Sequence, residues 1–216
     1  MAAIRTYEGA GVRINFDVKR CIHSRNCVLG LPGVFSETGK PWVDAAGAPA
    51  AEIAATIRQC PSGALTYEPA GGGAGEGAPA VNRARLWEHG PLEIRAGLTV
   101  GGATTCTRAV LCRCGASKNK PWCDNSHRDI AFKATSEPNP DVAKVAVEPA
   151  ARGGPVAVRT VENGPMNIAG NLEIIAGSGR RIACTTDAWF CRCGASANKP
   201  FCDGSHKRIG FQAAGS

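Results

Sequence analysis

The chain has 216 residues, a formal net charge of +7 and 44% hydrophobic residues, but only 6% aromatic residues. This length allows one ordinary domain or two to three small ones, and the scarcity of aromatic side chains favours small metal-stapled modules over one large core. Residues 1–12 have no apolar leader character, and no apolar run reaches the length of a membrane span. We therefore expect a cytoplasmic protein with no membrane partner.

The first 70 residues carry the pattern of a small α+β module. Residues 11–18 alternate as a strand, and a second short strand is predicted around Trp42 and Val43. Pro49 opens a helix over residues 50–59, which places Ile53 and Ile57 on one face. Residues 64–68 are predicted to form the closing strand.

This module contains two cysteines six residues apart, Cys21 and Cys27, and a remote Cys60 followed by proline. Over residues 4–69 it resembles the divergent single-cluster ferredoxins, and the resemblance implies a ferredoxin-like βαβαβ fold and a bound iron–sulfur cluster. Ser24 stands where the family usually has a further thiol. Three thiolates can hold a [3Fe-4S] cluster, or a [4Fe-4S] cluster whose fourth iron has a non-thiol ligand.

His23 is the nearest candidate for that fourth ligand. It is offset by one position from the missing thiol, so we favour a packing or supporting role for it over ligation, and Ser24 is expected beside the cluster. The family favours four irons and the ligand count favours three. Beyond this module, the glycine-rich residues 71–77 predict a flexible linker, so we divide the chain into residues 1–70, a linker 71–80, and domains 81–140 and 141–216.

Residues 81–110 and 155–190 predict short antiparallel strands. Both contain a similar five-residue sequence, GPLEI from Gly90 and GPMNI from Gly164, and in both segments apolar residues alternate with other residues. The second segment is longer, and we place its extra residues in a hairpin at 177–181. Cys106 and Cys184 lie on these strands, and we predict buried packing roles for them, with a redox-active thiol as the alternative.

Each strand segment is followed by one copy of the same motif, at residues 112–132 and 191–211. The two copies supply three thiols and one imidazole apiece: Cys112, Cys114, Cys123 and His127, then Cys191, Cys193, Cys202 and His206. In CxC an extended segment can turn both thiolates onto one metal, and CxxxH spans one helical turn. Three cysteines and one histidine also form a common zinc set, but zinc knuckles usually use CxxC pairs.

Four more residues are expected to support these ligands. Asp124 and Asp203 are placed to cap the short helix that carries the histidine, and Ser117 and Ser196 lie in the loop between the ligand pairs. That loop also contains Gly115 or Gly194 and a proline, so backbone N–H groups can point at cluster sulfides.

At these residues the sequence resembles the CDGSH iron–sulfur family. The second copy matches the motif throughout, and the first has Asn125 where the family has glycine. Asparagine is the non-glycine residue that most readily accepts a positive φ, so this departure is mild. The resemblance implies one [2Fe-2S] cluster per copy. Family members with one motif pair as homodimers, so we expect a monomer whose two mostly-β domains form a pseudo-dimer with internal two-fold symmetry.

The basic residues track the two motifs. We predict that they form a rim that steers an acidic redox partner, and because aromatic residues do not interleave with them we expect no nucleic-acid partner. The rim comprises Arg113, Lys118, Lys120, Arg128, Arg192, Lys199, Lys207 and Arg208.

Two functions fit these sites. One is electron transfer through two [2Fe-2S] clusters and one [3Fe-4S] or [4Fe-4S] cluster; the other is donation of iron or a cluster to an apo-acceptor through the labile histidine ligand. A structural or nucleic-acid adaptor remains if the metal is zinc. The sequence has no nucleotide loop, flavin fingerprint or catalytic triad, so we do not expect an enzyme.

Overall fold

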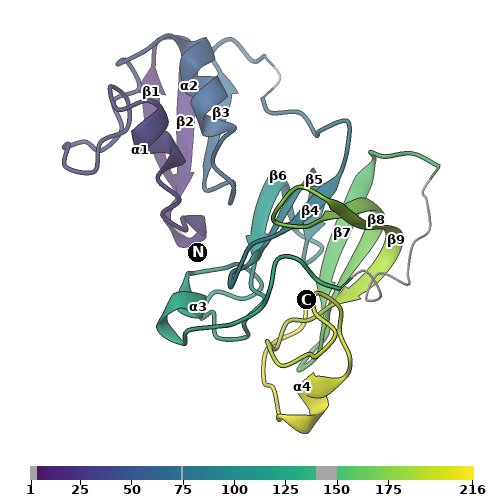
Figure 1. The fold of residues 1–216 in the computed structure, drawn as a ribbon. Helices are drawn as coiled ribbons and strands as arrows, with labels where there is room; N and C mark the ends of the chain where they lie inside the picture. The colour runs from purple at the N-terminus through teal and green to yellow at the C-terminus, as the bar shows by residue number, and fades with distance from the viewer. Residues whose placement is uncertain (1–3, 74, 140–149) are drawn as a thin grey trace. The chain divides into compact units, whose positions relative to one another are not determined.

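The computed structural model describes residues 4–73, 75–139 and 150–216, and the chain divides into two compact units, Met1–Gly77 and Ala78–Ser216 (Figure 1). The predicted boundary at residues 140 and 141 lies outside the described residues. Within the described residues, no helix is both long enough and apolar enough to cross a membrane.

The first unit is a three-stranded antiparallel sheet, in the order β1-β2-β3, with two helices between its last two strands. Its elements are β1 (Ile4–Gly9), β2 (Val12–Asp17), the 3₁₀ turn η1 (Val18–Arg20), α1 (Asn26–Gly30), α2 (Ala50–Ile57) and β3 (Leu65–Pro69). The helix after Pro49 and the closing strand are confirmed, and Ile53 and Ile57 are fully buried.

The predicted βαβαβ order is wrong, because the elements run β-β-α-α-β. Strand β1 is not predictable from the sequence, because it is an exposed edge strand whose side chains have no apolar alternation to mark it. The strand expected around Trp42 is only an isolated bridge between Phe35 and Val43. Trp42 instead packs edge-on against Phe16, with ring centroids 4.6 Å apart.

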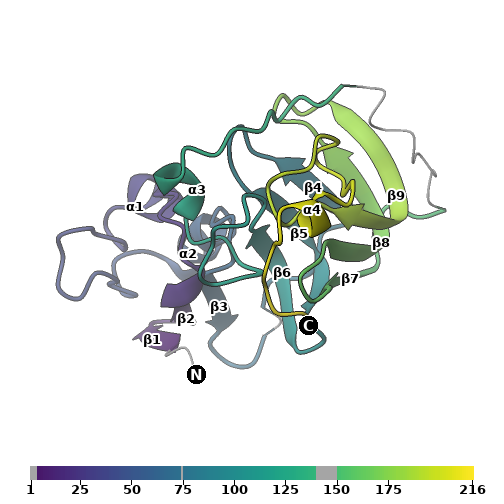
Figure 2. The ribbon, with the colours of Figure 1, turned by 90° about the horizontal axis from the view of Figure 1, so that it is seen from below.

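In residues 78–139 and 150–216, the second unit has six strands in one sheet and two four-residue helices. The strands are β4 (Arg83–Leu86), β5 (Leu92–Val100), β6 (Thr104–Leu111), β7 (Pro155–Thr160), β8 (Met166–Ile175) and β9 (Arg181–Phe190). The helices α3 (Ser126–Asp129) and α4 (Ser205–Arg208) follow β6 and β9. Figure 1 shows both helices outside the sheet, and in Figure 2, which is seen from below, α4 lies in front of it.

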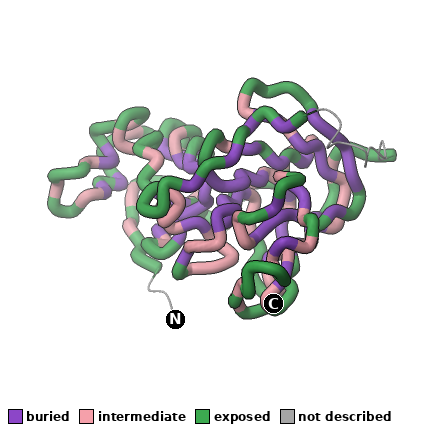
Figure 3. The backbone as a smooth tube through the Cα atoms, turned by 60° about the horizontal axis from the view of Figure 1, so that its bottom comes forward, coloured by how far each residue is buried: buried purple, intermediate pink, exposed green. Residues whose placement is uncertain are grey.

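The two sequence copies share this sheet. The first strand of each copy lies between the long middle strands of both: β4 pairs antiparallel with β5 and parallel with β8, and β7 pairs antiparallel with β8 and parallel with β5. The alternating apolar residues are buried as predicted, in one cluster drawn from both copies (Figure 3). Because each buried Leu or Ile contributes roughly 1.5–3 kcal/mol, a copy separated from this common core would lose much of its stability.

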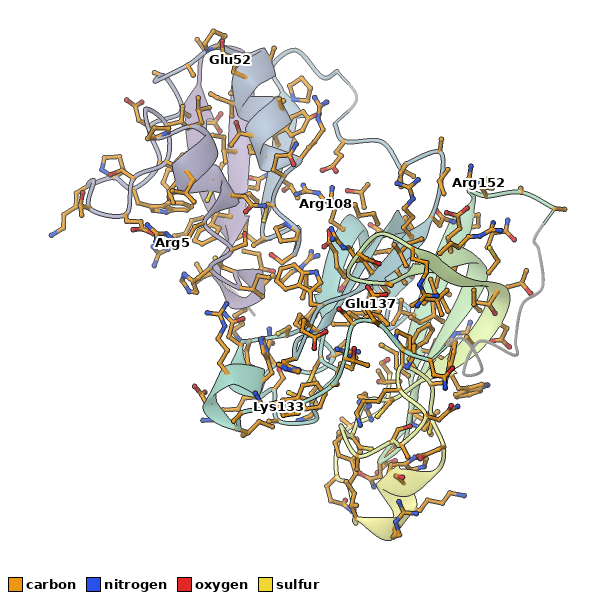
Figure 4. The ribbon with its side chains drawn as sticks, in the orientation of Figure 1. Arg5, Glu52, Arg108, Lys133, Glu137 and Arg152 are labelled. Atoms are coloured by element: carbon orange, nitrogen blue, oxygen red, sulfur yellow. The ribbon has the colours of Figure 1, made fainter. Side chains whose placement is uncertain are left out.

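The ends of each copy also reach the other copy. Ser136 accepts a hydrogen bond from the Gly177 amide, and the carboxylate of Glu137, labelled in Figure 4, accepts one from the Ser178 amide at 2.7 Å. Conversely, Ser216 lies against Gly101 in the turn between β5 and β6. The turn between β8 and β9, residues 176–180, is longer than its counterpart 101–103, which confirms the predicted longer hairpin.

Candidate metal centre

The predicted ligands of the second unit meet in pairs at short distances. The sulfur atoms of Cys112 and Cys114 are 3.7 Å apart, and those of Cys191 and Cys193 are 3.8 Å apart. The sulfur of Cys123 is 3.5 Å from Nδ1 of His127. The matching distance from Cys202 to His206 is 3.4 Å.

These distances fit two ligands on one tetrahedral metal ion. Two sulfurs at about 2.3 Å from such an ion lie about 3.8 Å apart, and a sulfur and an imidazole nitrogen lie about 3.6 Å apart. No group of three or more His, Cys, Asp and Glu side chains converges on one point in the described part of the chain. The candidate ligands are therefore arranged as pairs, and the distance between the two donor atoms of each pair fits one metal ion.

Backbone hydrogen bonds bring the two ligand pairs of each site together. Leu111 and Trp122 form a β-bridge, the Cys112 amide donates to the Pro121 carbonyl at 2.8 Å, and the Cys123 amide donates to the Val110 carbonyl at 2.9 Å. The loop that leaves β6 thus folds back onto its own start. The second copy has equivalent bonds from Cys191 to Pro200 and from Cys202 to Trp189, both at 2.8 Å.

The two loop serines stabilise the fold of the ligand loop back onto its own start. The Ser117 hydroxyl donates to the Trp122 carbonyl at 2.7 Å and accepts from the Asn119 amide at 3.0 Å. Ser196 makes the same two bonds with Phe201 and Asn198, at 2.7 and 3.0 Å. Both serines are buried, so their contribution is to loop shape.

The two aspartates tie the loop to the histidine helix. Asp203 accepts hydrogen bonds from the Ser205 amide at 2.9 Å and the Ala197 amide at 2.8 Å, and these bonds lower its pKa. Burial raises the pKa of Asp124, but hydrogen bonds from Ser126 and the Lys118 amide leave it below its usual range. The N-cap residues are Asn125 and Gly204, so each aspartate lies one residue before the cap position predicted for it and accepts a hydrogen bond from the amide of the first helical residue.

Replacing Asp203 by asparagine should loosen this tie. An asparagine can keep one oxygen acceptor but not the second, so we expect a loss of about 1 kcal/mol in unfolding free energy near neutral pH. Because the folded-state pKa of Asp203 is depressed, its contribution exists above about pH 4 and disappears as the pH falls further, so the variant and the parent should converge in acid. Urea unfolding at pH 7 and pH 3 measures this, and an equal difference at both pH values would contradict it.

Backbone N–H groups point at the ligand sulfurs. The Ala116 amide lies 3.4 Å from the Cys114 sulfur, and the Asn125 and Gly204 amides lie 3.4 Å from the sulfurs of Cys123 and Cys202. Asn125 and Gly204 have φ values of 72° and 85°, which confirms the predicted positive φ at this turn. Such amides stabilise thiolate charge and therefore favour metal-bound cysteines.

Several ligand side chains hold their protons until a metal displaces them. The hydrogen bond shared with Cys114 lowers the pKa of Cys112 to about 6 and raises that of Cys114. Burial raises the pKa values of Cys123 and Cys191 to about 11, and burial lowers the pKa of His127. Metal loading at neutral pH therefore releases protons, and the His127 ring is already in its neutral, ligating form.

Two residues of the predicted basic rim are not on the surface. Arg113 and Arg192 have only 2% and 1% of their surface exposed, because each guanidinium turns inward and donates to backbone carbonyls. The remaining six rim residues are exposed or half-buried. One sequence feature distinguishes these two arginines from the other rim residues: in both copies an arginine lies between the two cysteines of the CxC pair.

The three cysteines of the first unit line one cavity of about 480 Å³. His23, which is exposed, and Ser24, which is half-buried, also line this cavity, so both lie beside the predicted cluster site, and the supporting role of His23 stays a prediction. Burial raises the pKa values of Cys21 and Cys27. Cys60 lies 3.6 Å from the Ser62 hydroxyl. The cavity offers soft sulfur donors on an apolar wall, as a polynuclear iron cluster requires.

The two cysteines of the second unit that lie outside the motifs are both at least partly buried. Cys184 is buried and Cys106 is half-buried against the shared cluster. Both positions fit the predicted packing role, fully for Cys184 and in part for Cys106. His89 pairs with the backbone of Ala134, with its amide 2.9 Å from that carbonyl, and has a structural role.

The paired cysteine and histidine side chains and the cysteine-lined cavity define a protein with thiolate-rich candidate metal sites, and comparison with known proteins indicates iron–sulfur domains. The family profile described as divergent 4Fe-4S mono-cluster matches residues 7–69, and the profile described as iron-binding zinc finger CDGSH type matches residues 88–128 and 163–207. The uncharacterized protein YjdI of Escherichia coli strain K12 is 38% identical over 63 residues, which are 29% of this chain and 83% of YjdI; the same protein of Escherichia coli O157:H7 matches equally. The chain belongs to the CDGSH iron–sulfur family and has an N-terminal divergent single-cluster ferredoxin domain.

Proposed function

We propose that the protein is a three-cluster electron carrier of the cytoplasm. Cys112, Cys114, Cys123 and His127 would hold one [2Fe-2S] cluster, and Cys191, Cys193, Cys202 and His206 would hold the other. The observation that supports this most is the pairing of candidate ligands at single-metal distances, twice in each copy. Cys21, Cys27 and Cys60 would hold a [3Fe-4S] or [4Fe-4S] cluster. The clusters supply one-electron chemistry, and the chain's own residues hold them and set their surroundings.

The contacts between the copies support an internal pseudo-dimer in a monomeric chain. Gly115 lies so close to the Cys193 carbonyl that a Cβ placed on it would be 2.5 Å from that oxygen, and Gly194 lies closer still to the Cys114 carbonyl. The reciprocal strand pairs of β4 and β7 have the same exchange symmetry. Two ligand loops in backbone contact favour electron exchange between the two sites over isolated action.

Metal and sulfide analysis combined with EPR tests the cluster content directly. We expect two [2Fe-2S] clusters per chain and one further cluster with three or four irons, and Cys60→Ser should remove only the last signal. A colourless protein with stoichiometric zinc would overturn the proposal. That result would favour the structural or nucleic-acid adaptor, the remaining alternative for three cysteines and one histidine.

Cluster donation is the second candidate function, and the histidine ligands favour it. Imidazole accepts protons near neutral pH, so a ligand of each cluster can be released by mild acid. Incubation with an apo-ferredoxin separates the two functions. Donation moves the chromophore to the acceptor, whereas electron exchange leaves it on this chain. We place electron transfer first because three cluster sites in one chain form a relay more readily than a donor, and we assign no catalytic reaction to them.

The exposed helix ends are the proposed contact point for an acidic partner. After His206, the exposed end of α4 carries Lys207, Arg208 and the half-exposed Ile209, and we call it the second tip. The first tip, at the end of α3 after His127, carries Arg128, Asp129 and Ile130. The second tip is therefore the more basic. Apolar area beside positive charge suits transient docking of an acidic protein.

Reversing the charges of Lys207 and Arg208 to glutamate should slow oxidation of the reduced protein by anionic hexacyanoferrate(III) roughly 10-fold at low salt. Oxidation by cationic hexaammineruthenium(III) should accelerate, because the local potential changes sign. The control is Arg159→Glu with Arg181→Glu, the same charge change at exposed strand positions. Stopped-flow rates in which both double variants behave alike would refute docking at this tip.

A further inference from the structure

An arginine lies between the two cysteines of each CxC pair and points into the protein. Nε of Arg113 donates to the Gly90 carbonyl at 2.9 Å, and Nη2 donates to the Trp87 carbonyl at 2.7 Å. In the second copy, Arg192 makes the same bonds with Gly164 at 3.0 Å and Val161 at 2.6 Å. These bonds tie the CxC loop to the turn that precedes the long middle strand of its copy.

Each guanidinium also binds the segment after its histidine helix. Nη1 of Arg113 donates to the Thr135 carbonyl at 3.3 Å, and Nη1 of Arg192 donates to the Ala214 carbonyl at 2.8 Å. The guanidinium carbons lie 5.8 and 5.4 Å from the ring centroids of Phe132 and Phe211. The positive charge is therefore fixed in place by neutral groups on several sides.

Neither guanidinium forms an ion pair with a carboxylate in the part of the chain that the structure describes. A buried charge without an opposite charge is costly, and both arginines are almost fully buried. Carbonyl oxygens offset part of this cost. Glu88 acts electrostatically on Arg113 without forming an ion pair, and cysteine sulfurs of the metal centres act on both arginines.

The sulfur with the largest electrostatic effect on each guanidinium belongs to the other copy. The ligand loops touch through their backbones, at Gly115 against Cys193 and at Gly194 against Cys114. Among the charged groups that act on the pKa of Arg113, Cys191 has the largest effect, ahead of Cys114 of its own loop. For Arg192 the corresponding group is Cys112. Both observations indicate a crosswise arrangement.

We propose that each buried arginine is a positioning residue for the cluster of the opposite copy: Arg113 raises the reduction potential of the second cluster, and Arg192 raises that of the first. This inference rests on the proposed [2Fe-2S] clusters. A cluster gains negative charge when it accepts an electron, so a fixed cation nearby stabilises the reduced form more than the oxidised form. Because the guanidinium is buried, solvent and salt screen this interaction only weakly.

Crosswise placement makes the two sites interdependent. A copy that loses its arginine would change the redox behaviour of its neighbour while keeping its own four ligands. Arginine suits the task because it stays charged and its planar fork can be fixed by several carbonyls at once. Lysine would retain the charge but not the full set of bonds.

The test uses the full chain with only one CDGSH cluster at a time and an EPR-monitored redox titration. Cys123→Ser disables the first site, and in that background Arg113→Gln should lower the midpoint potential of the second cluster, with Arg113→Lys shifting it less. Cys202→Ser disables the second site, and there Arg192→Gln should lower the potential of the first cluster. Lys118→Gln is the control, because it removes one exposed charge from the same loop.

The inference is overturned if Arg113→Gln shifts the second cluster no more than Lys118→Gln does, or if Arg113→Gln shifts only its own cluster in the two-cluster chain. If the glutamine variant does not fold, Arg113→Met, of similar length and without polar atoms to satisfy, is titrated in the same way. Failure of the parent chain to bind any [2Fe-2S] cluster would instead refute the proposed function, so the two failures are distinguishable.

Discussion

Alanine at Gly194 is expected to destabilise the second unit by about 3–5 kcal/mol, a large effect for a single methyl group. Gly194 has a φ of 83°, and left-handed backbone costs a non-glycine residue about 1–3 kcal/mol. The added Cβ would also meet the carbonyl group of Cys114, a backbone atom that cannot rotate away. Overpacking of this kind adds about 1–3 kcal/mol.

A matched substitution separates these two costs. Gly179 has a φ of 93° with no described atom within 4 Å of an added Cβ, so Gly179→Ala should show the backbone cost alone, about 1–2 kcal/mol. Urea unfolding followed by circular dichroism measures both variants. Equal losses in the two would show that the contact between the ligand loops does not contribute to stability.

The pairing of the candidate ligand side chains could be predicted because it depends on local geometry. Residues two apart on an extended segment and four apart on a helical turn have their relative positions set by backbone geometry, so Cys112 with Cys114 and Cys123 with His127 pair as the spacing indicates. Helix α2 was also predictable, because its apolar residues share one face and Pro49 starts it. Such signals depend on neighbouring residues alone.

The arrangement of the strands depends on distant residues and was not predictable in the same way. Nothing in the sequence of β4 indicates that it pairs with β8 as well as β5, because burial of one face requires only that Ala84 and Leu86 be apolar, whichever strands flank them. The inward arginines were misassigned for a related reason. A charged residue beside a metal motif usually faces solvent, and only the carbonyls of the preceding turn, brought close by folding, make burial of Arg113 favourable.

Replacing both histidine ligands, His127 and His206, by cysteine is expected to abolish the acid sensitivity of the [2Fe-2S] absorbance. In the parent chain, a proton competes with iron for each imidazole. The protonated fraction of a free imidazole rises on the order of 30-fold between pH 8 and pH 5, so we expect the visible absorbance to decay at least 10-fold faster at pH 5. A cysteine thiolate bound to iron competes with protons more effectively, because its charge strengthens the bond to the metal.

The metal-free protein should show a related trend from the same cause. Burial lowers the pKa of His127 in the folded state, so the unfolded chain binds more protons below about pH 6.5 and the folded state loses stability as the pH falls through that range.

The single variants provide internal controls, because His127→Cys and His206→Cys should each remove about half of the acid-dependent absorbance change if the two sites contribute equally. Stopped-flow absorbance after a pH jump measures the decay. Decay in the double variant that is still faster at pH 5 by the parent's ratio would show that the histidines are not the acid-labile ligands.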